Sequence, residues 1–374
     1  MRLEIHKANL AIGIAVFFSA CLPIASQDRV LVGRSEPAER VTVVEGGGHF
    51  PVACILKNGE LAVVLRGGAP HVGIRGRLDL VTSNDSGRTW SAPRTIVDTP
   101  FDDRNPAFGQ LSDGALVMAY VVVAVGYDES GLREKNATTD GVYVIRSTDA
   151  GSTWTSPYKI NIVGSNGFSP YGKIVQLADG TALMAIYLTV SKSGTEESHL
   201  YRSRDNGKTW GDPSRIAVGY NETALVSLPD GRLLAALRST GGRIAVAYSE
   251  DKGRSWSEPS QLTRDQEHPG DLIVLRDGSV VLTYGERNRP YGVRALVSHD
   301  GGRSWDTDHL VILADDAPNW DTGYPSSVVL KDGRIFTVYY QTDVAYDPAL
   351  LNEVLEKSVH GAKARGVIWR VRGQ

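Results

Sequence analysis

The stretch Ser249-Glu250-Asp251-Lys252-Gly253-Arg254-Ser255-Trp256 is one of five copies of the motif Ser-x-Asp-x-Gly-x-Thr/Ser-Trp in this chain of 374 residues. The motif is typical of a hairpin turn, because the short Asp side chain can accept hydrogen bonds from backbone N–H groups and Gly tolerates positive φ. The Trp side chain can cover the base of the hairpin. The other copies are Ser83–Trp90, Ser147–Trp154, Ser203–Trp210 and Ser298–Trp305. Five copies predict a repeat protein.

A second turn, Asn-Gly or Asp-Gly between two apolar runs, alternates with the first. This dipeptide is the strongest short-range hairpin signal, since both central residues of the turn need φ > 0. The six examples are Asn58-Gly59, Asp113-Gly114, Asp179-Gly180, Asp230-Gly231, Asp277-Gly278 and Asp332-Gly333. Their spacings of 55, 66, 51, 47 and 55 residues are close to the roughly 40 to 50 residues of a four-stranded propeller blade.

The two turns together predict an all-β fold, a six-bladed β-propeller of four-stranded antiparallel blades. The last blade lacks the eight-residue motif, but Gly366–Val371 reads as its third strand and Arg40–Val44 as its fourth. The N- and C-terminal strands would then close the ring, which removes exposed sheet edges. A ring of repeats is one cooperative body, so residues 26–374 are expected to form a single domain.

The composition argues against several classes of partner. The formal net charge of −3 leaves no electrostatic footprint for nucleic acid, and 41% hydrophobic residues are ordinary for a globular chain. Neither metal-ligand spacing nor a nucleotide fingerprint occurs, so no metal and no cofactor are expected. We expect a monomer.

The N-terminal segment resembles an export signal over residues 1–25. Arg2 and Lys7 precede an apolar run, Leu10–Ala20, that is too short to span a membrane as a mature helix. An exported protein, periplasmic or extracellular and without an integral membrane span, is therefore expected. Phe18–Cys21 loosely resembles a lipoprotein cleavage site, so a lipid anchor on Cys21 is an alternative.

The repeat also predicts where a site could lie. Counting eight residues back from each Asn or Asp of the second turn gives the positions where the innermost strands begin, and side chains of one orientation converge there on a central funnel. We call this side of the ring the entrance face. The six positions are Phe50, Asn105, Tyr171, Glu222, Pro269 and Tyr324. The second strands end on the same face at Arg66, Val121, Tyr187, Arg238, Gly285 and Tyr340.

With these residues the chain resembles the sialidase (neuraminidase) superfamily. Asn221–Leu234, followed by Arg238, is similar to the family stretch that carries the catalytic Glu and one Arg of a carboxylate-binding triad. Tyr324 stands where that family keeps its tyrosine nucleophile. The resemblance implies Tyr324 as nucleophile, Glu222 as its activating base, and Arg238 with Arg287 or Arg289 as ligands of the substrate carboxylate.

This chemistry suits a sugar whose anomeric carbon bears a carboxylate. A neutral phenol avoids the repulsion that a carboxylate nucleophile would meet from the carboxylate of the substrate. Arginine binds a carboxylate through a bidentate, charge-assisted fork. Two insertions, Val121–Gly141 and Thr342–Ala364, are expected to wall the funnel. A walled funnel favours removal of a terminal sugar, so an exo-glycosidase is predicted.

The chain departs from the family pattern at two places. Where sialidases carry a triad Arg, this chain has Gly48-His49-Phe50-Pro51. In the loop Arg66–Arg77, where the family places its Asp general acid, His71 has the only side chain that exchanges a proton near neutral pH. His71 is therefore a candidate catalytic residue. The remaining candidates, for substrate binding, are Arg66, His49, Arg104, Asn105 and Tyr171.

Three other functions stay open. Propeller lyases resembling this layout use His and Tyr to abstract the proton beside a uronate carboxylate, which an arginine would make more acidic. The same propeller also hosts glycosidases of other specificities, because a fold does not determine chemistry. An incomplete arginine triad also fits a glycan-binding propeller without catalysis.

Overall fold

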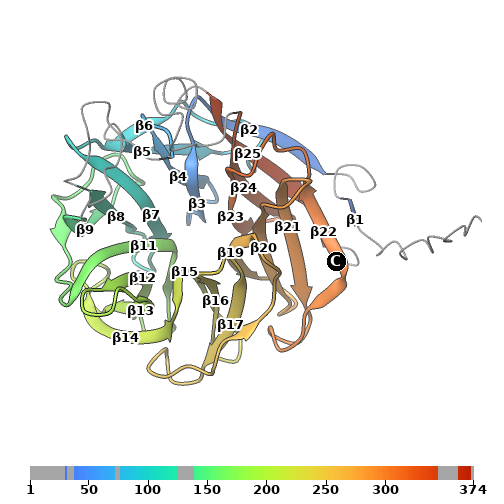
Figure 1. Ribbon diagram of the computed structural model, residues 1–374. Helices are drawn as coiled ribbons and strands as arrows, with labels where there is room; N and C mark the ends of the chain where they lie inside the picture. Colours follow the sequence, from blue (N-terminus) through green and yellow to red (C-terminus); the bar gives the residue numbers. More distant parts are fainter. Residues whose placement is uncertain (1–29, 32–37, 72–75, 124–138, 344–360, 372–374) are drawn as a thin grey trace, which may run out of the picture.

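The chain forms a ring of antiparallel β-sheets around a central axis (Figure 1). The computed structural model describes residues 30–31, 38–71, 76–123, 139–343 and 361–371. The predicted export signal and Cys21 lie outside these residues, as do large parts of both predicted insertions. No helix in the described ranges has the length and apolar character needed to cross a membrane.

The strands follow one another from the axis outward in a repeating order of four. The innermost strands are β3 (His49–Ile55), β7 (Asp102–Gln110), β11 (Ser165–Gln176), β15 (Tyr220–Ser227), β19 (Glu267–Val274) and β23 (Thr322–Val329). The second strands are β4 (Leu61–Gly67), β8 (Leu116–Val123), β12 (Ala182–Val190), β16 (Leu233–Ser239), β20 (Val280–Glu286) and β24 (Ile335–Thr342). The third strands are β5 (Arg77–Ser83), β9 (Gly141–Ser147), β13 (Glu196–Ser203), β17 (Ile244–Ser249), β21 (Gly292–Ser298) and β25 (Ala362–Trp369). The outer strands are β6 (Arg94–Val97), β10 (Tyr158–Lys159), β14 (Gly211–Val218), β18 (Ser260–Gln261), β22 (Asp306–Ala314) and β2 (Glu39–Glu45), with β1 (Val30–Leu31) beside β22.

The number of separate sheets differs from the predicted six. The described strands form three four-stranded sheets, one five-stranded sheet and one eight-stranded sheet, because β7 and β11 pair in parallel over two residue pairs. Gly109 explains the approach of these two strands, since a Cβ there would lie 2.5 Å from the carbonyl oxygen of Ile174. Without a side chain at this position, the two backbones can come together near the axis.

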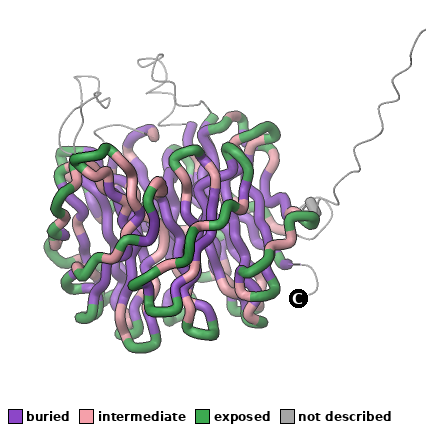
Figure 2. The backbone as a smooth tube through the Cα atoms, turned by 60° about the horizontal axis from the view of Figure 1, so that its bottom comes forward, coloured by how far each residue is buried: buried purple, intermediate pink, exposed green. Residues whose placement is uncertain are grey.

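An N-terminal strand and the C-terminal strand meet in one sheet, as the sequence predicts. β2 pairs antiparallel with β25, and the order of this sheet is β2-β25-β24-β23. β1 was not predicted, because two residues are too short to show a strand pattern. Buried residues run through the body of the strands, whereas the turns on both faces are exposed (Figure 2).

The eight-residue motifs form the predicted turns. In the fourth copy, Ser249 Oγ accepts a hydrogen bond of 2.7 Å from the Gly253 N–H, and the Asp251 carboxylate accepts one of 2.9 Å from the Ser255 N–H. The hydrogen bonds from Ser255 lower the pKa of Asp251 to about 2. The Trp256 indole donates a hydrogen bond of 3.3 Å to the Gly253 carbonyl. Local turn chemistry therefore explains the repeat.

Gly253 gives a test of this packing. Its φ is +82°, and an added Cβ would press on Leu200 Cδ2. Gly231 has a similar φ of +86° but nothing within 4 Å of the added Cβ. Gly231→Ala is therefore expected to cost about 1–2 kcal/mol of unfolding free energy from backbone strain alone, and Gly253→Ala about 1–3 kcal/mol more from overpacking. Chemical denaturation of both variants measures the difference, and equal losses would contradict the packing account.

Candidate active site

Every innermost strand is irregular where it begins. A register shift occurs in β3, β7, β11, β15, β19 and β23, and each of the six predicted entrance positions lies within or at the edge of one. Phe50, Asn105 and Tyr324 also have positive φ, at 52°, 51° and 48°. A β-bulge turns a side chain out of the alternating pattern, and positive φ is costly for residues with a Cβ. Such strain persists only where the surrounding structure holds it, and it concentrates at functional sites.

Tyr324, Glu222 and Arg238 form one hydrogen-bonded group across the funnel. The Tyr324 hydroxyl donates a hydrogen bond of 2.6 Å to Glu222 Oε1. Arg238 Nη1 donates one of 2.6 Å to Glu222 Oε2 and one of 3.3 Å to the Tyr324 hydroxyl oxygen. Strands β23, β15 and β16 supply these residues, so the ring brings together side chains that lie far apart in the sequence.

Burial controls the charge of this group. Tyr324 is 7% exposed and Glu222 is 5% exposed. Burial, followed by the nearby Glu222 carboxylate, raises the pKa of the Tyr324 phenol above its ordinary value. Burial alone would lower the pKa of Arg238, but the carboxylate of Glu222 reverses this and raises it. At neutral pH a protonated phenol therefore donates to the carboxylate.

The guanidinium group of Arg287 lies over the Tyr324 ring. Its guanidinium carbon is 5.5 Å from the ring centroid. The Nε and Nη2 atoms of Arg287 and the Nε atom of Arg238 are buried and have no hydrogen-bond acceptor in the described part of the chain. A buried donor without an acceptor costs about 1–3 kcal/mol, more when it is charged. The site therefore presents N–H groups that a bound anion could satisfy.

A second polar group lies beside the first, separated by the ring of Phe50. His71 Nδ1 is 2.9 Å from Asp321 Oδ1, and the Tyr340 hydroxyl donates a hydrogen bond of 2.7 Å to the same oxygen. The Phe50 ring centroid lies 5.0 Å from that of His71 and 4.8 Å from that of Tyr324. Burial would raise the pKa of Asp321, but His71 and the neighbouring donors bring it below its ordinary value.

His49 is fully buried beside this second group. Its ring centroid is 4.9 Å from that of Tyr340, and neither ring nitrogen has a hydrogen-bond partner among the described residues. Burial lowers the pKa of His49 to about 3, against the opposing effect of Asp321. His49 is therefore neutral near pH 7.

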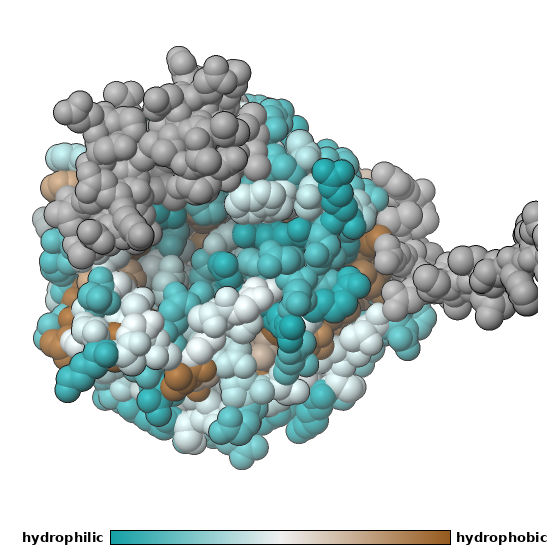
Figure 3. Space-filling view, viewed as in Figure 1, coloured by the Kyte–Doolittle hydropathy of each residue, from teal (hydrophilic) through white to brown (hydrophobic). Residues whose placement is uncertain are grey.

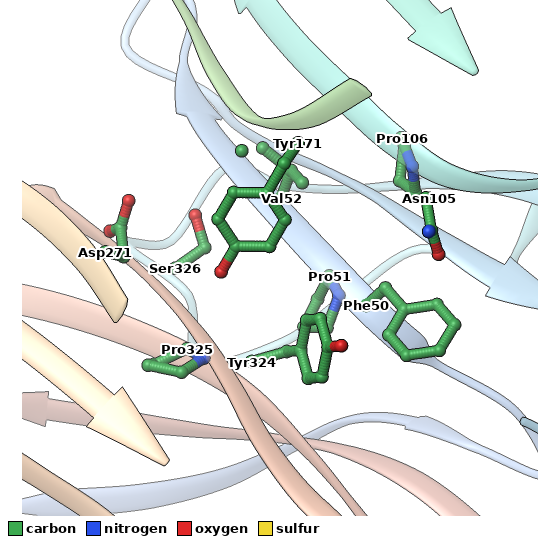
Figure 4. A pocket seen from close by; sticks show the side chains of 11 residues that line it. Phe50, Pro51, Val52, Asn105, Pro106, Tyr171, Asp271, Tyr324, Pro325 and Ser326 are labelled. Atoms are coloured by element: carbon green, nitrogen blue, oxygen red, sulfur yellow. The ribbon is translucent and has the colours of Figure 1, made fainter. Parts of the chain in front are cut away.

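A pocket of about 350 Å³ opens where the entrance residues converge. Phe50, Asn105, Tyr171 and Tyr324 reach it from four different strands (Figure 4). The Tyr171 hydroxyl donates a hydrogen bond of 3.0 Å to the Gly270 carbonyl, and Asn105 Nδ2 donates one of 3.0 Å to Ser169 Oγ. On the face seen in Figure 3, hydrophilic side chains gather towards the middle of the ring.

The remaining arginines proposed from the sequence have other partners than Tyr324 and Glu222. Arg66 is fully buried in an ion pair with Asp102, and Arg104 Nη2 donates a hydrogen bond of 3.1 Å to the His71 carbonyl. Arg289 is exposed and donates a hydrogen bond of 3.3 Å to the Tyr291 hydroxyl. Arg289 also borders a separate hollow of about 450 Å³. Of the two arginines that the resemblance leaves open, Arg287 is the one beside Tyr324.

The model of the BNR repeat-like domain matches residues 65–337, well over half of the chain. The chain belongs to this family. Its curated relatives include a sialidase from Bacteroides fragilis, which is 25% identical over 56% of this chain and 40% of its own length. A sialidase from Micromonospora viridifaciens is 25% identical over 59% of this chain and 37% of its own length. The BNR-repeat protein thus spans less than half the length of these relatives.

Solved structures support the fold of the BNR-repeat protein. A protein of unknown function from Dyadobacter fermentans is 26% identical with a TM-score of 0.75, and the alignment covers 89% of this chain and 98% of that one. A mutant of the NanB sialidase from Streptococcus pneumoniae has a TM-score of 0.67 at 14% identity, over 87% of this chain and 68% of its own. The second likeness is one of fold alone.

The structure of the BNR-repeat protein adds residues that sequence reasoning did not select. Asp321 directly precedes β23, and a polar residue so close to Tyr324 was a signal that could have been used. His268 is 3% exposed, and burial, with the charges of Arg238 and Arg287, lowers its pKa to about 2. His268 is therefore a neutral neighbour of the two arginines.

Proposed function

We propose that this BNR-repeat protein is a sialidase-like exo-glycosidase that removes a terminal, acidic sugar from a glycan. The observation that carries the proposal is the contact of 2.6 Å between the Tyr324 hydroxyl and Glu222, with Arg238 bound to both. A nucleophile within hydrogen-bond reach of its base, which a third group orients, is the arrangement that covalent catalysis requires.

In this proposal the Tyr324 oxygen attacks the anomeric carbon and its proton passes to Glu222. The phenol suits a substrate with a carboxylate at that carbon, because a carboxylate nucleophile would meet a like charge. Arg238 offsets the charge of Glu222 before the transfer. After the transfer, the positive charge of Arg238 stabilises the negative charge that develops on the Tyr324 oxygen.

The acidic substrate is inferred from the arginines. The buried N–H groups of Arg287 and Arg238 that lack acceptors in the described chain would be satisfied by a carboxylate. The curated relatives named as sialidases support the same class of substrate.

The finer architecture and the location of the protein are part of the proposal. We take the eight-stranded sheet as two blades that touch at β7 and β11, which gives six blades of four strands. Residues 26–374 would form one monomeric domain, exported through residues 1–25 or anchored through Cys21.

Elimination at a uronate is the second candidate, and one observation favours it. The pair of His71 and Asp321 lies one ring away from Tyr324, so two groups that can transfer a proton face the same funnel. In that reaction His71 would take the α-proton and Tyr324 would protonate the leaving oxygen.

A substrate panel separates these functions. The purified protein is incubated with 4-methylumbelliferyl α-N-acetylneuraminide, with neutral 4-methylumbelliferyl glycosides and with a glycan containing uronate. Release of fluorophore from the sialoside is the expected result. New ultraviolet absorbance of an unsaturated uronate would replace the proposal by elimination, and silence over the whole panel would favour glycan binding.

Arg287→Met tests the carboxylate ligand, with Arg289→Met as its matched control. Loss of hydrogen bonds to a charged group costs about 1.5–3 kcal/mol, which is roughly 10- to 100-fold in kcat/KM. We expect this loss for Arg287→Met on the acidic glycoside and a change below about threefold for the exposed Arg289→Met. Equal effects would contradict the assignment of Arg287.

A further inference from the structure

His71 is the exposed member of the aromatic and polar group next to Tyr324. Its side chain is 20% exposed, whereas that of Asp321 is 1% exposed and Tyr340 is fully buried. Its ring packs edge-on against Phe50, whose other neighbour is Tyr324. A sugar bound at Tyr324 would therefore have the imidazole of His71 on one side of its anomeric carbon.

The carboxylate of Asp321 is held in place by the loop before β23. The Asp321 N–H donates a hydrogen bond of 2.9 Å to Asn319 Oδ1, and the Asp321 carbonyl accepts one of 3.1 Å from Thr342 Oγ1. Asn319 Nδ2 in turn donates one of 2.7 Å to the Thr342 carbonyl. The backbone on both sides of the carboxylate is tied to β24, so the carboxylate has a defined orientation.

The elements packed around His71 carry several other titratable or charged groups. These are Tyr340 on β24, His49 on β3, Arg66 on β4, and Asp102, Asp103 and Arg104 on β7. Arg66 and Arg104 pair with Asp102, and His49 is neutral near pH 7. Asp321 is thus the carboxylate in direct contact with the imidazole. Because Nδ1 contacts Asp321, we expect proton exchange with a substrate at Nε2.

We propose that His71 is the general acid and base of the reaction at Tyr324, and that Asp321 is the positioning residue that orients its ring. This inference rests on the proposed glycosidase function. In the first step the Tyr324 oxygen bonds to the anomeric carbon and the bond to the leaving oxygen breaks. The leaving oxygen keeps the electron pair and takes a proton from His71 Nε2, while the phenol proton passes to Glu222.

The second step reverses the proton transfers. Water bonds to the same carbon and gives a proton to His71, and the bond to Tyr324 breaks. The phenolate recovers its proton from Glu222, so both groups return to their starting states. An alkoxide leaving group needs the acid in the first step, whereas an aryl leaving group departs without it.

The test compares two sialosides that differ in the leaving group, 4-methylumbelliferyl α-N-acetylneuraminide and sialyllactose, in His71→Gln and Asp321→Asn. For His71→Gln we expect kcat/KM on sialyllactose to fall about 10²–10⁴-fold, and less than about tenfold on the aryl glycoside. Asp321→Asn should show the same preference to a smaller extent.

The matched control is a His and Asp pair on the outer strand β22. His309 Nδ1 lies 2.9 Å from Asp306 Oδ2, with side chains 60% and 34% exposed. His309→Gln and Asp306→Asn should leave the rates on both substrates unchanged. Tyr340→Phe keeps the ring packing, removes one donor to Asp321 and serves as a second probe of orientation if Asp321→Asn does not fold.

Equal losses on the two substrates would overturn the acid role and leave His71 as a packing residue. A wild-type chain that hydrolyses neither sialoside would overturn the proposed function and this inference with it. The two failures are distinguishable, because the first requires an active wild-type enzyme.

Discussion

Tyr324→Phe is expected to lower glycoside hydrolysis at least about 10³-fold, because the variant keeps the ring but loses the attacking oxygen. The packing of the ring against Phe50, Tyr171 and Tyr340 does not depend on the hydroxyl, so the fold should survive. Initial rates on the aryl sialoside and thermal unfolding of the same preparation measure the two effects separately.

Tyr339→Phe is the matched control for this variant. Tyr339 neighbours Tyr340 on β24, is 2% exposed and packs in an apolar cluster rather than in the funnel. It should retain wild-type activity. A Tyr324→Phe enzyme within about tenfold of the wild-type rate would show that the phenol oxygen does not carry the reaction.

Glu222→Gln is expected to have the second largest effect, a loss of about 10²–10⁴-fold in kcat. The glutamine side chain has nearly the same shape, and its amide oxygen can still accept a hydrogen bond from Tyr324, but the NH2 group in place of the second oxygen cannot accept from Arg238 and the amide cannot take the phenol proton. The shape of the site is thereby kept while the transfer is lost. Glu197→Gln, at a carboxylate that binds His199 on β13, is the control.

A small effect of Glu222→Gln would indicate that the carboxylate acts only as a partner of Arg238. In that case Arg238→Met should lower the activity more than Glu222→Gln does, because Arg238 also contacts the Tyr324 hydroxyl and is a proposed ligand of the substrate carboxylate. Measurement of both variants on one substrate separates a proton acceptor from a structural ion pair.

The ring was predictable because its turns are local. The contacts of Asp251 with Ser255 involve residues a few positions apart, and the same motif recurs along the chain. Counting from the Asp-Gly turns then located Glu222 and Tyr324, because the same number of residues separates turn and entrance in each repeat, although a register shift interrupts the strand pairing at the entrance itself. The joining of β7 and β11 was not predictable, because it depends on how closely two backbones approach at Gly109.

The candidate site was predictable only in part. The sequence pattern left Arg287 and Arg289 equivalent, and only the path of the chain after β20 brings Arg287 over Tyr324. The pairing of His71 with Asp321 joins residues 250 positions apart, which no local pattern encodes. The position of a side chain along its strand could be predicted from the sequence. Which side chains meet across the ring could be seen only in the folded structure.

The most direct test of Tyr324 as nucleophile is to trap the glycosyl enzyme. A sialosyl fluoride with a second fluorine beside the anomeric carbon should glycosylate the nucleophile and then hydrolyse slowly, because the fluorine destabilises the oxocarbenium-like transition state. Cleavage after Arg303 and Lys331 releases residues 304–331, whose only tyrosine is Tyr324. Mass spectrometry with fragmentation should place one sugar on Tyr324. A sugar on any other residue, or inactivation without added mass, would contradict the assignment.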